Sequence, residues 1–249
     1  MEQFIAKDFN GAPFQLFGIH HLVALGIILL INVALLWRGK QIPQRWRMPL
    51  RITLAVILVV DEALWHLWNW YIGAWTVQTM LPLHLCSLLV FLSAIMLING
   101  NMAIYEFIYF LGIGGAMQAI LTPDAGPYGF PHFRFFQVFV SHGAIVTAGV
   151  FMTAVEGYRP YPKSILHVAV IGNLYMAFVA VVNWLLGSNY LFIAHKPETA
   201  SVLDLLPPWP VYILIMELMA VVMVLLLYTP FAWQDWQTRR AAKAAASIS

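Results

Sequence analysis

The sequence predicts an all-α, polytopic membrane protein of seven transmembrane helices, and three observations support that prediction. Hydrophobic residues make up 61% of the 249 residues and charged residues only 10%, whereas an ordinary soluble domain carries about 25% charged residues. Seven stretches each approach the roughly 20 mostly apolar residues that a spanning helix needs. Most lysines and arginines fall in loops that seven spans would place on one side of a bilayer. At this length we expect one domain, residues 1–249.

The seven expected spans follow one another with short connections. Pro82 suits the first turn of the third span, where its missing N–H costs nothing. Asn99, Gly100 and Asn101 form a tight turn between the third and fourth spans. The first 17 residues lack the basic start of a signal peptide, so we expect the first span to be retained. The expected spans are residues 18–37, 52–72, 81–98, 103–121, 135–155, 165–186 and 211–228.

The distribution of basic residues predicts the orientation. Seven spans put the termini on opposite sides, and the 13 lysines and arginines then divide ten to three between those sides. The smaller group is Lys7, Arg134 and Lys196. Because basic loops stay in the cytoplasm, we expect the N-terminus outside and the C-terminus in the cytoplasm.

Composition also excludes several classes of protein and site. No basic tract or aromatic–basic motif predicts binding to nucleic acid. A single cysteine excludes an internal disulfide and any multi-cysteine metal site. No HExxH or HxxxH pattern occurs, although His20, His66, His84 and His142 could meet in space. We therefore expect no metal and no cofactor.

Polar and ionisable side chains within the expected spans gather in the outer half. Each ionisable residue in a bilayer costs about 2.5–3.5 kcal/mol even on lenient scales, so several at one depth should not face lipid. We expect them to surround a shared polar cavity open to the outer side. Residues three or four apart share a helix face, which places Glu62, His66 and Asn69 on one stripe.

Cys86 is the candidate nucleophile of this cavity. A thiol becomes a good nucleophile when a histidine lowers its pKa, and a Cys–His pair with a carboxylate orienting the histidine performs acyl transfer. His84 is two residues away, about 200° around a helix, so His142 or His66 on another helix is the expected base, with His84 as an alternate. The plainer interpretation makes Cys86 a small buried apolar residue. The expected catalytic residues are Cys86, His142, His84, His66, Asp61 and Glu62.

Other polar residues suit substrate binding. Arg134 follows His132 by two residues at the mouth of the fifth span, and this pair suits a phosphate or carboxylate head group because arginine makes bidentate contacts. The alternative is that Arg134 snorkels outward. His142 likewise has an alternative role as an interhelical hydrogen-bonded tie. The expected substrate-binding residues are His132, Arg134, Asn69, Gln118 and Asn183.

Several longer strings, spread over residues 20–231, resemble the YwaF-type bacterial integral membrane proteins. That resemblance implies a bacterial plasma membrane. The family is distantly similar to a eukaryotic multi-pass protein implicated as an acyltransferase on ether phospholipids. By that resemblance Cys86 carries the acyl group and a histidine activates it. The strings are PLHLC (82–86), LTPD (121–124), FPHFRFFQVFVSH (130–142), GYRP (157–160), NYLF (189–192) and KPETASVLDLLPPWPVYIL (196–214).

The leading hypothesis is a cysteine-dependent acyltransferase or acyl hydrolase that acts on membrane lipids from the outer-facing cavity. The alternative is a module that binds or transports a small molecule, or that couples transport to protons. In that module the histidines and carboxylates form the site, and Cys86 only packs as a small apolar residue. A third hypothesis is a structural or sensory protein whose histidines report pH. The inverted repeats and broken helices of many transporters are not evident in the sequence.

Overall fold

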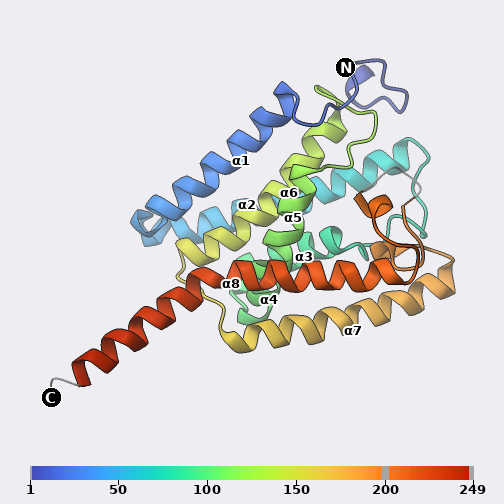
Figure 1. Cartoon of the computed structure of the whole chain (residues 1–249). Coiled ribbons are helices and arrows are strands. Elements are labelled where there is room, and N and C mark those ends of the chain that lie inside the picture. Colours follow the sequence, from blue (N-terminus) through green and yellow to red (C-terminus); the bar gives the residue numbers. More distant parts are fainter. Residues whose placement is uncertain (1, 198–201, 247–249) are drawn as a thin grey trace.

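The computed structural model describes residues 2–197 and 202–246, and these residues form helices and loops without strands (Figure 1). The helical character predicted from the sequence is confirmed. A π-helical stretch, η3, joins α4 to α5, so these three make one continuous segment. The α-helices and η3 are α1 Ile19–Arg38, α2 Gln44–Tyr71, α3 Leu85–Asn99, α4 Met102–Phe107, η3 Ile108–Gly112, α5 Ile113–Leu121, α6 Phe133–Ala154, α7 Pro162–Leu186 and α8 Val211–Ala246. Short 3₁₀ turns lie at Glu2–Phe4, Gly39–Gln41, Tyr190–Phe192 and Val202–Leu205.

Five segments of the described chain are long and apolar enough to cross a membrane, so the protein is a multi-pass membrane protein. Of the other two expected spans, α3 is apolar but has only 15 residues. The remaining one, α2, carries Asp61 and Glu62 among its 28 residues. The five segments are Ile19–Gln41, Met102–Leu121, Phe133–Ala154, Pro162–Leu186 and Val211–Ala242.

The start of α3 differs from the expectation. The helix begins at Leu85, with His84 as its N-cap, so Pro82 lies in the preceding turn and not in the first helical turn. The carbonyl of Leu83 accepts a hydrogen bond from Tyr175 Oη of α7 at 2.8 Å, which ties this turn to a distant helix. Cys86 is therefore the second residue of α3, at the end where the helix starts.

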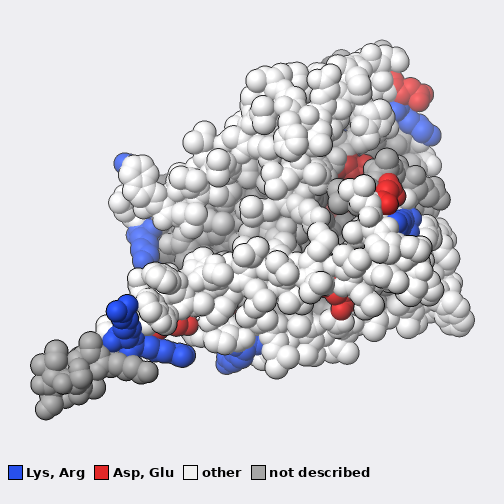
Figure 2. Space-filling model, viewed as in Figure 1, with Lys and Arg blue, Asp and Glu red and all other residues white. Residues whose placement is uncertain are grey.

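The helical segments alternate in direction and meet at two ends. At one end, called here the basic end, Arg51 Nε of α2 donates to the carbonyl of Leu97 in α3 at 2.6 Å. Arg51 also lies 3.5 Å from Glu156, which follows α6. At the other end, called here the histidine end, His21 Nε2 of α1 bonds to the carbonyl of Ile120 in α5 at 2.8 Å. Figure 2 shows lysines and arginines around the end that carries the C-terminal part of α8, and a largely uncharged middle.

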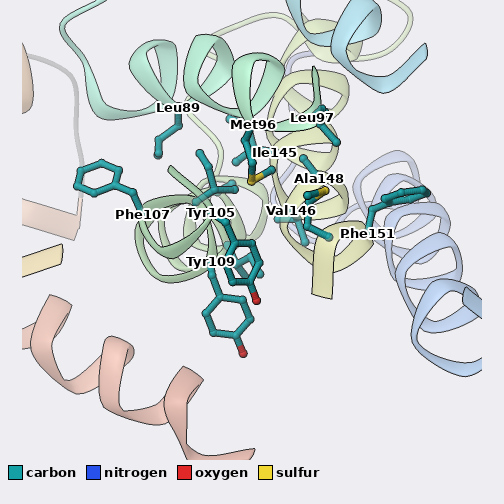
Figure 3. Packing of buried hydrophobic residues seen from close by; sticks show 14 of the residues in the cluster. Leu89, Met96, Leu97, Tyr105, Phe107, Tyr109, Ile145, Val146, Ala148 and Phe151 are labelled. Atoms are coloured by element: carbon teal, nitrogen blue, oxygen red, sulfur yellow. The ribbon is translucent and has the colours of Figure 1, made fainter. Parts of the chain in front are cut away.

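The core lies where α3, the α4–η3–α5 segment and α6 pack together. Within one apolar 18-residue window of each segment, buried residues make up 61% in Met102–Leu121 and 72% in Phe133–Ala154, but only 11% in α7 and in α8. Figure 3 shows Leu89, Met96 and Leu97 of α3 beside Tyr105 of α4 and Ile145 of α6. The segments α1, α7 and α8 are therefore peripheral helices with broad apolar faces turned outward.

The loop between α5 and α6 is pinned to the N-terminal segment. Tyr128 Oη donates to the carbonyl of Lys7 at 3.0 Å. A Cβ on Gly129 would lie 2.2 Å from the carbonyl oxygen of Ala12, so only glycine permits this close approach. This packing fixes the start of α6, and with it the position of Arg134.

Candidate functional site

Two buried carboxylates on adjacent positions of α2 form the centre of the candidate site. Asp61 and Glu62 lie where α2 packs against both α3 and α6. Asp61 Oδ2 accepts a hydrogen bond from Gln137 Nε2 of α6 at 3.2 Å. The other end of the same amide, Gln137 Oε1, accepts a hydrogen bond from Arg134 Nη1. Gln137 therefore bridges the carboxylate of Asp61 and the guanidinium of Arg134.

Arg134 is held inward over α2. Its Nη2 donates to the carbonyl of Asp124 at 2.9 Å, and its guanidinium lies 4.1 Å from the centre of the Trp65 ring. This geometry does not fit an arginine that snorkels freely into solvent. A guanidinium has five N–H donors, and the two hydrogen bonds described here leave others for a ligand.

Both ring nitrogens of His66 lie close to a polar atom of a neighbouring side chain. Trp75 Nε1 can only donate, and it lies 3.0 Å from His66 Nδ1, so Nδ1 is the acceptor. The proton of the neutral ring is then on Nε2, which lies 3.6 Å from Glu62 Oε1. A nitrogen that carries a proton has no lone pair for a second one, and the lone pair on Nδ1 already accepts from Trp75. His66 therefore fits a partner of Glu62 better than a general base.

Glu62 keeps unused hydrogen-bonding capacity. Its Oε1 atom is buried, and among the described residues it accepts no hydrogen bond. Buried polar atoms in native structures are nearly always bonded, so each exception needs an explanation such as a catalytic or ligand-binding role.

His142 has the tautomer of a general base. Its Nδ1 lies 2.7 Å from the carbonyl oxygen of Val138 in the preceding turn of α6. A carbonyl only accepts, so Nδ1 carries the proton and Nε2 presents a lone pair. No hydrogen bond to Nε2 is formed within the described residues, and the side chain is half-buried. His142 is thus free at the nitrogen that would take a proton.

Cys86 lies half-buried at the start of α3, the helix that packs against both α2 and α6. Within residues 2–197 and 202–246, its Sγ forms no hydrogen bond with an imidazole. The structure thus places Cys86 on a helix that packs against those of Glu62 and His142, and the predicted Cys–His hydrogen bond is not formed among the described residues. His84 is separate, because its ring packs on the rings of Tyr190 and Phe192 at centroid distances of 5.1 and 5.2 Å.

Both ring nitrogens of His132 form hydrogen bonds with backbone groups. Its Nδ1 accepts from the amide of Arg134 at 3.0 Å, and its Nε2 lies 3.0 Å from the carbonyl of Ala6. Burial lowers the pKa of His132, which favours the neutral ring that this pattern requires. With both nitrogens engaged, His132 has no donor left for a head group. It positions Arg134 by holding that residue's amide.

The remaining expected binding residues do not join this site. Gln118 is exposed on α5. Asn183 is buried but caps the end of α7, where its Oδ1 accepts from the amide of Tyr190 and from Ser188 Oγ, both at 2.8 Å. Asn69 is buried and donates to the carbonyl of Trp65 on its own helix at 2.9 Å. The expected set of polar residues on five helices reduces to a smaller group on α2, α3 and α6.

Two polar residues of importance were missed by the sequence reasoning. Gln137 lies one helical turn after Arg134, and this spacing signals a shared face. Glu106 is a buried carboxylate in α4 near the basic end, where it accepts from Ser164 Oγ at 2.5 Å and lies 3.3 Å from His167 Nδ1. A carboxylate within the expected apolar span 103–121 was the sequence feature that could have identified Glu106. Polar groups inside the helices are therefore not confined to the histidine end.

A family model described as the TMEM164 family matches residues 16–228. No curated protein matches, and no solved structure matches. In the described chain, no three His, Cys, Asp or Glu residues lie together as a metal site would require.

Proposed function

The chain belongs to the TMEM164 family, and on that premise we propose that it is a cysteine-dependent acyltransferase or acyl hydrolase of membrane lipids. The observation that carries the proposal is the state of His142. It presents an unprotonated, unoccupied Nε2 on the helix that packs against those carrying Glu62 and the only cysteine. The resemblance to YwaF-type proteins, and through them to an acyltransferase with a catalytic cysteine, supports the same assignment and a bacterial plasma membrane.

The proposal includes seven spans, with α2 and α3 completing the five apolar ones. The alternating directions of the helices support it, because each loop then joins neighbouring helix ends. The N-terminus lies outside and the basic end faces the cytoplasm, as the division of Lys and Arg favours. The polar groups of α2 that would be costly in lipid face α3 and α6 instead. The α2–α3–α6 site then opens toward the outer leaflet.

In the proposed reaction, Cys86 Sγ attacks the carbonyl carbon of a lipid ester while His142 Nε2 takes the thiol proton. The ester C–O bond breaks, and His142 returns the proton to the leaving alkoxide of the lysolipid. The acyl group remains as a thioester on Cys86. A hydroxyl of an acceptor lipid, or water, then attacks this thioester, gives its proton to His142 and releases the thiol. Because catalytic hydrogen bonds are often long before substrate binds, the Cys86–His142 contact is expected to close on the bound lipid.

Arg134 and Glu62 would hold the polar part of the lipid. Arg134 is fixed by Trp65, Gln137 and the carbonyl of Asp124, and its free N–H groups suit a phosphate. The free Oε1 of Glu62 can accept a hydrogen bond from the attacking hydroxyl. Asp61 acts through Gln137 as a positioning residue for Arg134.

The test is acyl transfer by purified full-length protein in neutral detergent micelles with an isotope-labelled phospholipid. We expect labelled lysolipid exchange and an acyl adduct on Cys86 that hydroxylamine removes, both detected by mass spectrometry. Cys86→Ser and His142→Gln should abolish the adduct, while Gln118→Ala, at an exposed residue of α5, should leave it unchanged. An adduct-free wild type, or equal acyl transfer by Cys86→Ser, overturns the proposal.

A second candidate is a transport or binding module, favoured by one observation. The best-connected network, Asp61–Gln137–Arg134, does not include Cys86, and no described hydrogen bond reaches Sγ. In that case ligand binding or flux survives Cys86→Ser and is lost in Glu62→Gln. In the acyl-transfer case both substitutions impair the protein.

A further inference from the structure

The second half of α8 leaves the bundle. The helix has 36 residues, which is about 54 Å at 1.5 Å per residue, whereas a bilayer core is about 30 Å thick. Figure 1 shows its last turns projecting beyond the other helices. This end lies on the cytoplasmic side in the orientation given under Proposed function, and the inference that follows depends on that orientation and not on acyl transfer.

The direction of the projecting part is set by specific contacts. Pro230 lacks the N–H that would bond to the carbonyl of Leu226, and Thr229 Oγ1 fills that place at 2.7 Å. The neighbouring carbonyl of Leu227 accepts from Tyr109 Oη at 2.9 Å. Beyond this point Asp235 pairs with Arg159, before α7, at 2.7 Å. These contacts fix α8 against the bundle as far as Asp235, and the helix continues from there in the same element.

An aromatic and basic face lies on this extension. Its side chains flank a shallow, open depression and come from Trp233, Trp236, Gln237, Arg240 and Ala241. The two indole rings stack with centroids 4.9 Å apart, and the side chains are 59% and 49% exposed. The guanidinium of Arg240 lies 5.3 Å from the centre of the Trp236 ring.

The charge on this extension is not balanced locally. Asp235, the acidic residue nearest in sequence, is already paired with Arg159. Arg239 and Arg240 are exposed and form no ion pair with an acid among the described residues. Figure 2 shows blue side chains gathered at this end of α8. An anion is the ligand whose charge this surface complements.

We propose that this face of α8, Trp233, Trp236, Arg239 and Arg240, binds the head group of an anionic phospholipid in the cytoplasmic leaflet. Tryptophan prefers the head-group level of a membrane, and arginine makes bidentate contacts with phosphate. Basic residues that directly follow a spanning helix bind the anionic lipids of that leaflet. The stacked indoles would contact the glycerol and upper acyl region while the guanidinium groups contact the phosphate.

The experiment measures binding of fluorescent phosphatidylglycerol to full-length protein in neutral detergent micelles, with phosphatidylcholine as the neutral comparison. We expect wild type to prefer phosphatidylglycerol and the Arg239→Gln/Arg240→Gln variant to bind it about 10- to 30-fold more weakly. Trp233→Ala/Trp236→Ala should also weaken binding, although it keeps every charge. Monodisperse elution from a sizing column shows that each variant is folded.

The matched control is Lys40→Gln/Arg45→Gln, which removes two exposed charges from the same end of the protein but away from the indole pair. We expect a change of less than about threefold. An equal loss in this control assigns the effect to bulk charge and overturns the proposal. So does a wild type without preference for phosphatidylglycerol, or full competition by millimolar inorganic phosphate, which would indicate a free-anion site. Arg240→Lys, which keeps the charge but not the planar group, should lie between wild type and the double variant.

Discussion

Two buried glutamates at opposite ends of the molecule show how differently the same side chain is used. Both oxygens of Glu106 are engaged, one by Ser164 Oγ at 2.5 Å and the other by His167 Nδ1 at 3.3 Å. Glu62 is as deeply buried, yet its Oε1 accepts no hydrogen bond within the described chain. Glu106 therefore links α4 to α7 with both carboxylate oxygens engaged, whereas Oε1 of Glu62 can still accept a hydrogen bond from a ligand.

The histidines divide in the same way. His21 accepts from the amide of Phe17 at 2.9 Å and reaches the carbonyl of Ile120 at 2.8 Å, so both its nitrogens are engaged. His142 engages Nδ1 alone. Burial by itself therefore does not identify a functional residue here. What His142 and Glu62 share is a polar side-chain atom to which the described residues form no hydrogen bond.

The largest effect should separate these two histidines. We expect His142→Ala to lower the rate of acyl transfer by about 10²- to 10⁴-fold, because a general base contributes that much. His21→Ala should leave the rate per folded molecule unchanged but lower stability by about 1–3 kcal/mol, since two buried backbone groups lose their partners. Turnover and thermal unfolding are measured on the same preparations. Equal rates for the two variants would show that the free Nε2 has no catalytic role.

The two glutamates provide the second test. Glu106→Ala should lower the thermal midpoint, because the hydroxyl of Ser164 loses its buried acceptor at a cost of about 1–3 kcal/mol. It should leave the rate per folded molecule intact. Glu62→Ala removes the 3.6 Å approach of His66 Nε2 to Oε1 but no hydrogen bond to that atom, so we expect a smaller loss of stability and a clear loss of activity. The reverse pattern would mean that Glu62 is the structural residue.

A third, smaller effect concerns how Arg134 is held. Gln137→Ala removes the bridge to Asp61, and hydrogen bonds to charged groups contribute about 1.5–3 kcal/mol. We expect a KM raised about tenfold with kcat little changed, because the substituted residue positions the binding group and does not touch the reacting atoms. Gln118→Ala, at an exposed residue of α5, is the matched control. A fall in kcat alone would place Gln137 closer to the chemistry than proposed.

The smallest effect is a pH dependence of stability at His132. Burial lowers its pKa in the folded protein, while the unfolded chain keeps a value of about 6.5. Below pH 6.5 the unfolded state therefore binds more protons, and stability falls as the pH drops toward the folded-state pKa. The thermal midpoint at pH 5.5 should be lower than at pH 7.5. The fall should be shallower in His132→Gln, and an unchanged slope would refute this role.

The overall architecture follows closely from the sequence because it depends on local quantities. Runs of apolar residues predict helices, and α1, α6 and α7 lie within a few residues of their expected bounds. The expectation was wrong at Pro82, which lies before α3, because the turn there is held by Tyr175 from α7. That contact joins residues 92 apart in sequence, and no local pattern reports it.

The candidate site was predictable only as a set of residue types. The sequence indicated Asp61, Glu62, Cys86, Arg134 and His142, and the structure places them on three mutually packed helices. It also indicated His132, Gln118 and Asn183, which serve the backbone or lie exposed. All of these residues look alike along the chain, because a polar residue in an apolar run carries the same signal whether it binds a ligand or a carbonyl.

The sequence by itself determined that this protein is a helical, multi-pass membrane protein with most of its positive charge in alternate loops. Hydrophobicity and helix propensity act over one or two turns, so a chain read in order contains that information. Only the tertiary structure decided which polar atoms are already bonded. The partners of those atoms come from segments up to 126 residues away, as for His132 and Ala6. The free atoms of Glu62 and His142 become visible only once every other partner has been assigned.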